Sequence, residues 1–193
     1  MRPFWNLFLR LQGWKTRGSF PYHLKKCVVI VGPHTSSWDF IIALAFRSQL
    51  RLQRLNFLGK AELFEGPFGF FFKKLGGFPV DRFHKHHMVD QVAAIFHLHN
   101  NFILALSPEG TRKKVDRLRT GFYHIAKKAG VAIVMAGMDF ASKEVSFAEP
   151  FFPSDDEAAD FERIHRFYAG IQGKIPEQGM SHLIHTNANP PIL

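Results

Sequence analysis

The sequence predicts an α/β fold: a single domain with a mixed, partly parallel sheet flanked by helices, plus an N-terminal amphipathic helix. Three observations lead to this prediction. Short β-branched apolar runs alternate along the chain with longer segments of helical periodicity. The length of 193 residues fits one domain. Apolar residues make up 46% of the chain, which is enough to bury a core and excludes a disordered protein.

Residues 1–24 are expected to form a basic, aromatic segment ahead of a main domain at residues 25–193. Large apolar side chains recur there at the spacing of one helical stripe: Phe4, Leu7, Phe8, Leu11 and Trp14. A stripe with basic neighbours is typical of a helix that lies at a membrane interface. We therefore expect residues 1–17 to contact an anionic membrane surface. In the alternative, the stripe packs against the main domain and the charges are solvated.

Strands are expected where short apolar, β-branched runs end at turn residues. These runs lie at residues 27–32, 55–59, 78–80, 102–107, 131–137 and 143–148. The clearest of them is FILALS at 102–107. Because helical segments separate most of these runs, we expect part of the sheet to be parallel.

Helices are expected where apolar residues recur every three or four positions. These segments lie at residues 39–52, 61–77, 87–100, 121–129 and 155–172. Gly66 and Pro67 break the second segment, and Gly130 is expected to end the fourth. The last segment has an acidic first turn and one inner stripe: Phe161, Ile164, Tyr168 and Ile171. The tail at residues 187–193 is expected to be extended.

The single cysteine and the apolar runs exclude several classes of protein. Cys27 alone cannot form a disulfide framework or a multi-cysteine metal site, and it fits a reducing compartment. The longest apolar runs, such as residues 40–46, are far shorter than the roughly 18 residues of a membrane span. Arg10 and Gln12 interrupt the N-terminal apolar stretch, so no signal peptide is expected. These features predict a soluble or peripheral protein.

The net charge of +9 lies entirely in the first third of the chain. Residues 1–60 contain ten Lys and Arg residues and a single acid, Asp39, whereas the rest of the chain is balanced. A basic segment rich in aromatic residues suits either an anionic lipid or a nucleic acid. No nucleic-acid-binding motif is present, so we expect no nucleic-acid partner.

His34 and Asp39 lie five positions apart, between a predicted strand and the helix that follows it. The carboxyl ends of strands are where α/β sheets bind ligands. An imidazole there can accept a proton from a hydroxyl, and a carboxylate can hold its other ring nitrogen. In the alternative, Ser36 or Ser37 caps the helix and Asp39 only complements the helix dipole.

The segment SPEGTR at residues 107–112 follows the clearest predicted strand. Its proline and glycine favour a turn from which three polar side chains project: Glu109, Thr111 and Arg112. A guanidinium suits a phosphate or carboxylate, and a glutamate can accept hydrogen bonds from hydroxyls or orient the arginine. Arg82, after the glycine turn at residues 76–77, is a second candidate anion ligand. The alternative for each segment is an ordinary turn with a local ion pair.

Together these segments resemble the motifs of the glycerolipid acyltransferase family, of which lysophosphatidate acyltransferase is the familiar member. His34, Ser36 and Asp39 match its His-x4-Asp motif. Residues 77–82 match its apolar stretch ending in Asp-Arg, and residues 107–112 match its Phe-Pro-Glu-Gly-Thr-Arg motif with Ser107 in the first position. Residues 131–135 align with its Val-Pro-Ile-Val-Pro motif but lack both prolines. The resemblance covers residues 25–140.

The resemblance implies acyl transfer from acyl-CoA or acyl-carrier protein to the hydroxyl of a lysophospholipid-like acceptor, with no acyl-enzyme, cofactor or metal. His34 is then the general base and Asp39 orients it. The implied substrate-binding residues are Ser36, Arg82, Glu109, Gly110, Thr111 and Arg112. Of these, the two arginines would hold the acceptor's anionic head, and Glu109 would bind its hydroxyls. Backbone N–H groups near Trp38 and Asp39 would stabilise the oxyanion.

The departures from the family pattern leave the acceptor open. Ala132 and Met135 replace prolines, Ser107 replaces an aromatic residue, and Thr120 stands where a lysine often precedes Gly121. We expect a cytoplasmic enzyme bound peripherally to the cytoplasmic face of the membrane. Two other functions stay open: a nonenzymatic protein that binds anionic lipid or nucleic acid, and a thioesterase or other hydrolase that uses the same His–Asp pair with water.

Overall fold

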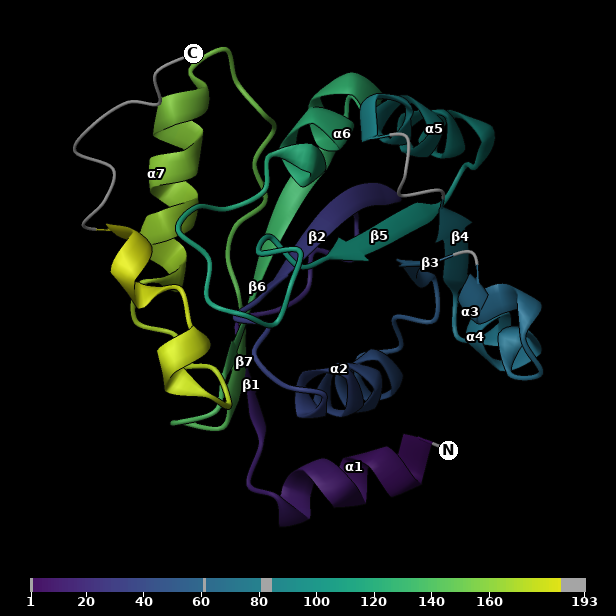
Figure 1. Cartoon of the computed structure of the whole chain (residues 1–193). Helices are drawn as coiled ribbons and strands as arrows, with labels where there is room; N and C mark the ends of the chain where they lie inside the picture. The colour runs from purple at the N-terminus through teal and green to yellow at the C-terminus, as the bar shows by residue number, and fades with distance from the viewer. Residues whose placement is uncertain (1, 61, 81–84, 185–193) are drawn as a thin grey trace.

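Seven strands form one sheet in the computed structural model, which describes residues 2–60, 62–80 and 85–184 (Figure 1). Their order across the sheet is β1-β7-β6-β2-β5-β3-β4. Neighbouring strands are parallel except β6 and β7, which confirms the predicted mixed, partly parallel sheet. The bounds are β1 (Lys15–Arg17), β2 (Lys26–Gly32), β3 (Leu55–Lys60), β4 (Gly77–Val80), β5 (Phe102–Leu106), β6 (Ala132–Asp139) and β7 (Glu144–Phe147).

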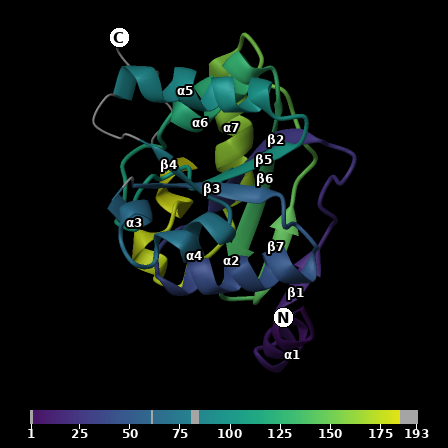
Figure 2. The ribbon, with the colours of Figure 1, turned by 90° about the vertical axis from the view of Figure 1, so that its right-hand side faces the viewer.

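Helices cover both faces of this sheet (Figures 1 and 2). One face carries α5 (Lys85–Leu98), α6 (Gly121–Ala129) and α7 (Glu157–Tyr168). The other face carries α2 (Trp38–Gln49), and α1 (Arg2–Leu11) packs on α2 from outside. The short helices α3 (Glu62–Glu65) and α4 (Gly69–Lys74) lie beside β3 and β4. Two 3-10 turns, η1 (Pro176–Gln178) and η2 (Ser181–Ile184), follow α7.

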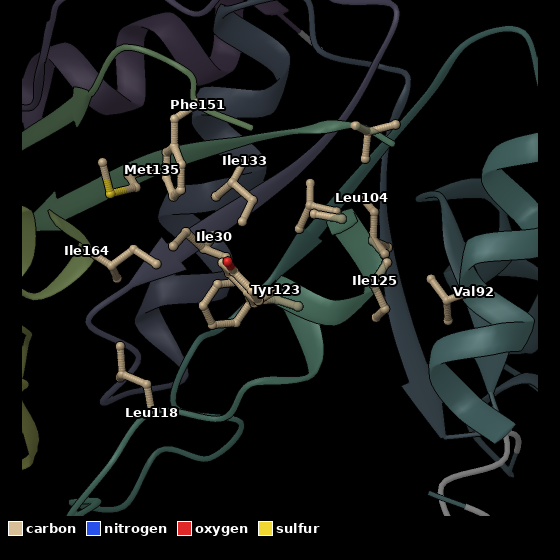
Figure 3. Packing of buried hydrophobic residues seen from close by; sticks show 14 of the residues in the cluster. Ile30, Val92, Leu104, Leu118, Tyr123, Ile125, Ile133, Met135, Phe151 and Ile164 are labelled. Carbon is tan, nitrogen blue, oxygen red and sulfur yellow. The ribbon is translucent and has the colours of Figure 1, made fainter. Parts of the chain in front are cut away.

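Alternate residues of the central strands enter opposite layers of the core, because successive side chains of a strand point to opposite faces. In β2, Val28 and Ile30 pack in the layer under α5, α6 and α7. Cys27 and Val29 pack in the opposite layer. Figure 3 shows the first layer, in which Ile30 and the neighbouring strand residues surround the buried ring of Tyr123. The predicted inner stripe of α7 also belongs to this layer, with Ile164 and Tyr168 fully buried.

Helix α1 has two apolar faces, and only one of them packs on the protein. Leu9 is fully buried, and Trp5 and Phe8 pack in the same cluster with α2. The second face consists of Phe4, Leu7 and Leu11, which are 64%, 56% and 76% exposed. The predicted single stripe is therefore divided: its Trp14 lies beyond the helix and is buried, and three of its residues stay outside.

Most element bounds lie close to their predicted positions, and the differences concern short or polar segments. Strand β1 has the sequence KTR with no apolar residue, so no pattern predicts it. Helix α7 ends at Tyr168, earlier than predicted, and the chain continues into the 3-10 turns. The tail at residues 187–193 lies outside the described residues. Among the described residues, no helix is long and apolar enough to cross a membrane.

Candidate active site

Two of the predicted functional segments meet at the carboxyl edge of the sheet. Strand β2 pairs directly with β5 in parallel register, with Ile30 opposite Leu106. Because parallel strands end at the same edge, the loop at residues 33–37 lies beside the loop at residues 107–120 (Figure 1). The candidate site forms between these two loops.

His34 and Asp39 are in direct contact. The distance between His34 Nδ1 and Asp39 Oδ2 is 3.0 Å. Because an ionised carboxylate can only accept hydrogen bonds, Nδ1 carries the hydrogen and Nε2 keeps a lone pair. The His34 side chain is 34% exposed, so a substrate can reach the ring. This arrangement supports the predicted use of His34 as a base and of Asp39 as the group that orients it.

The turn before α2 holds the Asp39 carboxylate in place. Its Oδ2 also accepts hydrogen bonds from the backbone N–H groups of Thr35, at 2.7 Å, and Ser36, at 2.8 Å. The Asp39 side chain is only 5% exposed, and Oδ1 is buried without a hydrogen-bond partner among the described residues. Asp39 therefore closes the turn and holds the imidazole with the same oxygen atom.

Glu109 lies beneath the site and not at its surface. It is 1% exposed. Its Oε1 accepts a hydrogen bond from the backbone N–H of His34 at 2.6 Å, and its Oε2 accepts one from Ser107 Oγ at 2.8 Å. Burial raises the pKa of the Glu109 carboxyl, although these donors and the neighbouring histidine oppose the rise. The predicted contact with acceptor hydroxyls stays a prediction, since the described contacts of both oxygen atoms are with the protein itself. The geometry fits a positioning residue that joins the 107–112 loop to His34.

Arg112 is exposed at the mouth of the site, where Nη1 donates to Ser37 Oγ. Ser36 stabilises the turn in which it lies. Its Oγ accepts a hydrogen bond from the N–H of Trp38, and its carbonyl oxygen accepts one from the N–H of Asp39. These two N–H groups are the predicted oxyanion donors, and both are already engaged in the turn. Arg112 therefore extends the site outward, whereas Ser36 stabilises the start of α2.

Three predicted site residues remain. Gly110 and Thr111 lie in the 107–112 loop, and Arg82 lies outside the described residues. Gly110 adopts a φ of +66°, a left-handed conformation that glycine adopts without strain. Its N–H donates to the Ser107 carbonyl, and this closes the turn. Thr111 Oγ1 accepts from the N–H of Lys113, again within the loop. Arg82 lies outside the described residues, so its predicted contact with an anion stays a prediction.

The order of these segments along the chain, and the contact between them, match a known family. Residues 15–139 match the family model described as Acyltransferase. The chain belongs to the acyltransferase family. The predicted resemblance to glycerolipid acyltransferases is thereby confirmed, and so is the prediction of an enzyme. The matched region contains His34, Asp39 and the SPEGTR loop, so the contacts described above are those of an acyltransferase core.

A solved structure shares the fold of this acyltransferase. It is the 1-acyl-sn-glycerophosphate (LPA) acyltransferase PlsC from Thermotoga maritima, with a TM-score of 0.56. The two chains are 16% identical, and the match covers 84% of this chain and 74% of PlsC. The comparison with curated proteins gives no match.

The segment after α7 contacts the site of the acyltransferase, and no sequence pattern predicted this. The N–H of Ile175 donates to Thr35 Oγ1 at 3.1 Å, and Thr35 itself is 2% exposed. Gly173 packs so closely that a Cβ atom there would lie 2.6 Å from Thr35 Cγ2. Residues 173–175 therefore support the turn that carries His34. The His-x4-Asp pattern does not specify the residue at position 35, so the role of Thr35 became visible only in the structure.

The single cysteine is buried away from solvent. Cys27 is fully buried in β2, and burial raises the pKa of its thiol to about 12. Such a thiol forms almost no thiolate at neutral pH, which argues against an acyl-cysteine intermediate. Among the described residues, no group of three or more His, Cys, Asp or Glu side chains could hold a metal ion.

Proposed function

We propose that this acyltransferase transfers a fatty acyl group from a thioester donor, acyl-CoA or acyl-carrier protein, to the hydroxyl of a lysophospholipid-like acceptor. The observation that carries the proposal is the contact of His34 Nδ1 with Asp39 Oδ2, which directs the Nε2 lone pair of an accessible imidazole away from the carboxylate. A hydroxyl is a weak nucleophile, and a base at this position removes its proton as it attacks. General-base assistance of this kind is worth about 10²–10⁴-fold in rate.

The reaction needs only one proton shuttle. His34 Nε2 takes the hydroxyl proton while the acceptor oxygen bonds to the thioester carbonyl carbon. The tetrahedral intermediate then breaks its C–S bond, and the imidazolium returns the proton to the leaving thiolate. Asp39 stabilises the positive ring through the 3.0 Å contact. An ester and a free thiol leave, and His34 is again neutral.

The charged groups at the mouth of the site suit an anionic acceptor. We assign the acceptor's phosphate or other anionic head to Arg112, which is exposed beside Ser37, and to Arg82. Glu109 positions His34 from below through its backbone N–H. Gly110 and Thr111 shape the loop that presents Arg112.

Helix α1 supports binding to the membrane that holds such an acceptor. Its outer face exposes Phe4, Leu7 and Leu11, and the same helix carries two basic residues, Arg2 and Arg10. Apolar side chains at a bilayer interface and basic groups near anionic headgroups both favour binding, by about 1 kcal/mol per basic residue. We propose that residues 1–17 dock on an anionic, cytoplasmic membrane surface. The family match and strand β1 both begin at residue 15, so the proposed basic segment, residues 1–24, overlaps the acyltransferase core.

Purified protein tests the proposed reaction directly. We expect free thiol to appear only when an acyl thioester and a lysophospholipid are both present, and mass analysis to find the doubly acylated lipid. Thiol release at the same rate without the lysophospholipid would instead indicate a thioesterase. Binding of anionic liposomes with no product in any mixture of donor and acceptor would indicate a nonenzymatic lipid-binding protein.

A further inference from the structure

A cavity of about 320 Å³ lies beside the start of α2, close in the chain to Asp39. It lies between α1, α2, the turn after β6 and the segment after α7. Trp38, which directly precedes Asp39, forms one wall and is half exposed. Gly173 forms another, and it is the residue that packs on Thr35. The cavity therefore reaches both the start of α2 and the turn that carries His34.

The cavity is positively charged. Lys143 and Lys174 contribute to its lining, and none of the other described lining residues is acidic. Lys174 Nζ lies 5.8 Å from the centre of the Phe140 ring, and neither ammonium group has an ion pair among the described residues. The neighbouring acid, Asp139, lies outside the lining, and both of its oxygen atoms accept hydrogen bonds from nearby groups. Two free cations in one cavity suit a phosphate group.

The remaining walls combine aromatic rings with side-chain amides. Trp14 packs edge-on against Phe140 at 4.9 Å and closes the floor, with Ile42 beside them. Gln12 and Gln172 add amide groups that can donate and accept hydrogen bonds. The turn after β6 and the segment after α7 are joined by the hydrogen bond from Phe140 N to the Gln172 carbonyl at 2.8 Å. The cavity thus combines two positively charged lysines, a wall with two side-chain amides and an apolar floor.

We propose that this cavity binds the phosphopantetheine arm of the acyl-thioester donor. The arm carries a phosphate at one end, amides along its length and the thioester at the other end. Its phosphate would lie at Lys143 and Lys174, its amides at Gln12 and Gln172, and its thioester beside Trp38, at the start of the helix that carries Asp39. This inference rests on the proposed function, in which Arg112 already takes the acceptor's anionic head. Acyl-CoA and acyl-carrier protein both carry this arm, so the cavity serves either source.

Kinetics with donors that differ only in the phosphate test the assignment. In the variant Lys143→Ala/Lys174→Ala, we expect the KM for acyl-phosphopantetheine to rise about tenfold, while the KM values for acyl-pantetheine and for the lysophospholipid stay unchanged. The KM for acyl-CoA and for acyl-carrier protein should rise alike. Lys127→Ala/Lys128→Ala removes the same charge from α6, far from the cavity, and should leave every KM as in the wild type. The proposal would be overturned if the KM for the lysophospholipid rose, or if the KM rose for acyl-CoA alone. It would also be overturned if no KM changed.

A binding measurement separates this proposal from the proposed reaction. In the His34→Ala variant, we expect phosphopantetheine to change the tryptophan fluorescence, and pantetheine without the phosphate to bind at least five times more weakly. Trp38→Phe and Trp14→Phe in the same background should each reduce the signal, because both rings line the cavity, whereas Trp5→Phe should not. Equal binding of the two compounds would refute the phosphate site even if catalysis by His34 is confirmed. Preferential binding of phosphopantetheine would support the site even if the catalytic role of His34 fails.

Discussion

Asp39 is the residue on which the geometry of the active site depends most. A single oxygen atom, Oδ2, meets the imidazole of His34 and two backbone N–H groups of the turn. The sequence also left open an alternative, in which Asp39 only complements the dipole of α2. The contact at 3.0 Å supports the catalytic interpretation, because it selects the tautomer that leaves Nε2 as the base.

Asp39→Asn tests this dependence on charge and tautomer. We expect kcat to fall about 10²–10⁴-fold, because an amide stabilises the imidazolium poorly and its NH2 group favours the wrong tautomer. The KM for both substrates should change little, since Asp39 touches neither. Steady-state kinetics and a circular dichroism spectrum check the result. A variant with normal kcat and a native spectrum would show that the carboxylate is not needed.

Glu109 gives the stability of the fold a distinctive pH dependence. Burial raises its pKa, so the folded protein binds this proton more tightly than the unfolded chain does. The contribution of Glu109 is therefore fully present below the ordinary carboxyl pKa of about 4.3 and is lost as pH rises through the raised value. In Glu109→Gln, we expect the free energy of unfolding to decline less between pH 4.5 and 7 than in the wild type. Urea denaturation at these two pH values measures the difference, and equal declines would contradict the prediction.

At the scale of elements, the close approach of residues 173–175 to Thr35 predicts a contrast between two glycines. In Gly173→Ala, the new Cβ would lie 2.6 Å from Thr35 Cγ2, so the segment must move away from the turn that carries His34. We expect a loss of about 1–3 kcal/mol in the free energy of unfolding and a fall in kcat. Gly170→Ala is the matched control, because nothing lies within 4 Å of its Cβ position. If the two variants had similar thermal unfolding and activity, residues 173–175 would not be supporting the turn that carries His34.

Helix α1 leads to a second prediction at this scale, because the side chains of its outer apolar face are more than half exposed. Replacement of Phe4, Leu7 and Leu11 by serine should abolish sedimentation with anionic liposomes and leave the thermal unfolding temperature unchanged. Leu98→Ser is a control, since Leu98 is 82% exposed on α5, on the other side of the sheet. Liposome binding by the triple variant at the wild-type level would refute the docking of α1.

The elements that the sequence predicted well are those whose local pattern and tertiary environment agree. The central strands are apolar along most of their length because helices cover both faces, and Gly130 ends α6 as predicted, in a left-handed conformation. Strand β1 is fully exposed at the sheet edge, so its three polar residues give no strand pattern. The inner face of α1 could not be predicted either, because its apolar residues occupy two adjacent faces and only tertiary packing selects Leu9.

For the whole molecule, the parallel sheet is what brings the distant motifs together. His34 and Glu109 are 75 positions apart, yet a hydrogen bond of 2.6 Å joins them, because β2 and β5 are neighbours and end at one edge. The motifs predicted that these residues act together. They did not predict that Glu109 would be buried beneath His34, because burial depends on the packing of the whole edge of the sheet.

The fold also shows where the positive charge of the first 60 residues lies. The segment contains α1, β1, β2, α2 and β3, so its charge is spread over the outer helix and both ends of the sheet. Arg112 at the mouth of the site and the two lysines of the cavity add positive charge from outside that segment. An enzyme that joins an anionic thioester to an anionic lipid needs positive potential on both sides of its base.

The rate of acyl transfer by His34→Ala tests the central claim most directly. The donor and the lysophospholipid are both supplied at saturation, and the ester product is measured by mass. If Nε2 of His34 is the general base, the variant should form product at least 10²-fold more slowly than the wild type while still binding both substrates. Product formation at the wild-type rate would contradict the account, because no other described group is placed to take the hydroxyl proton.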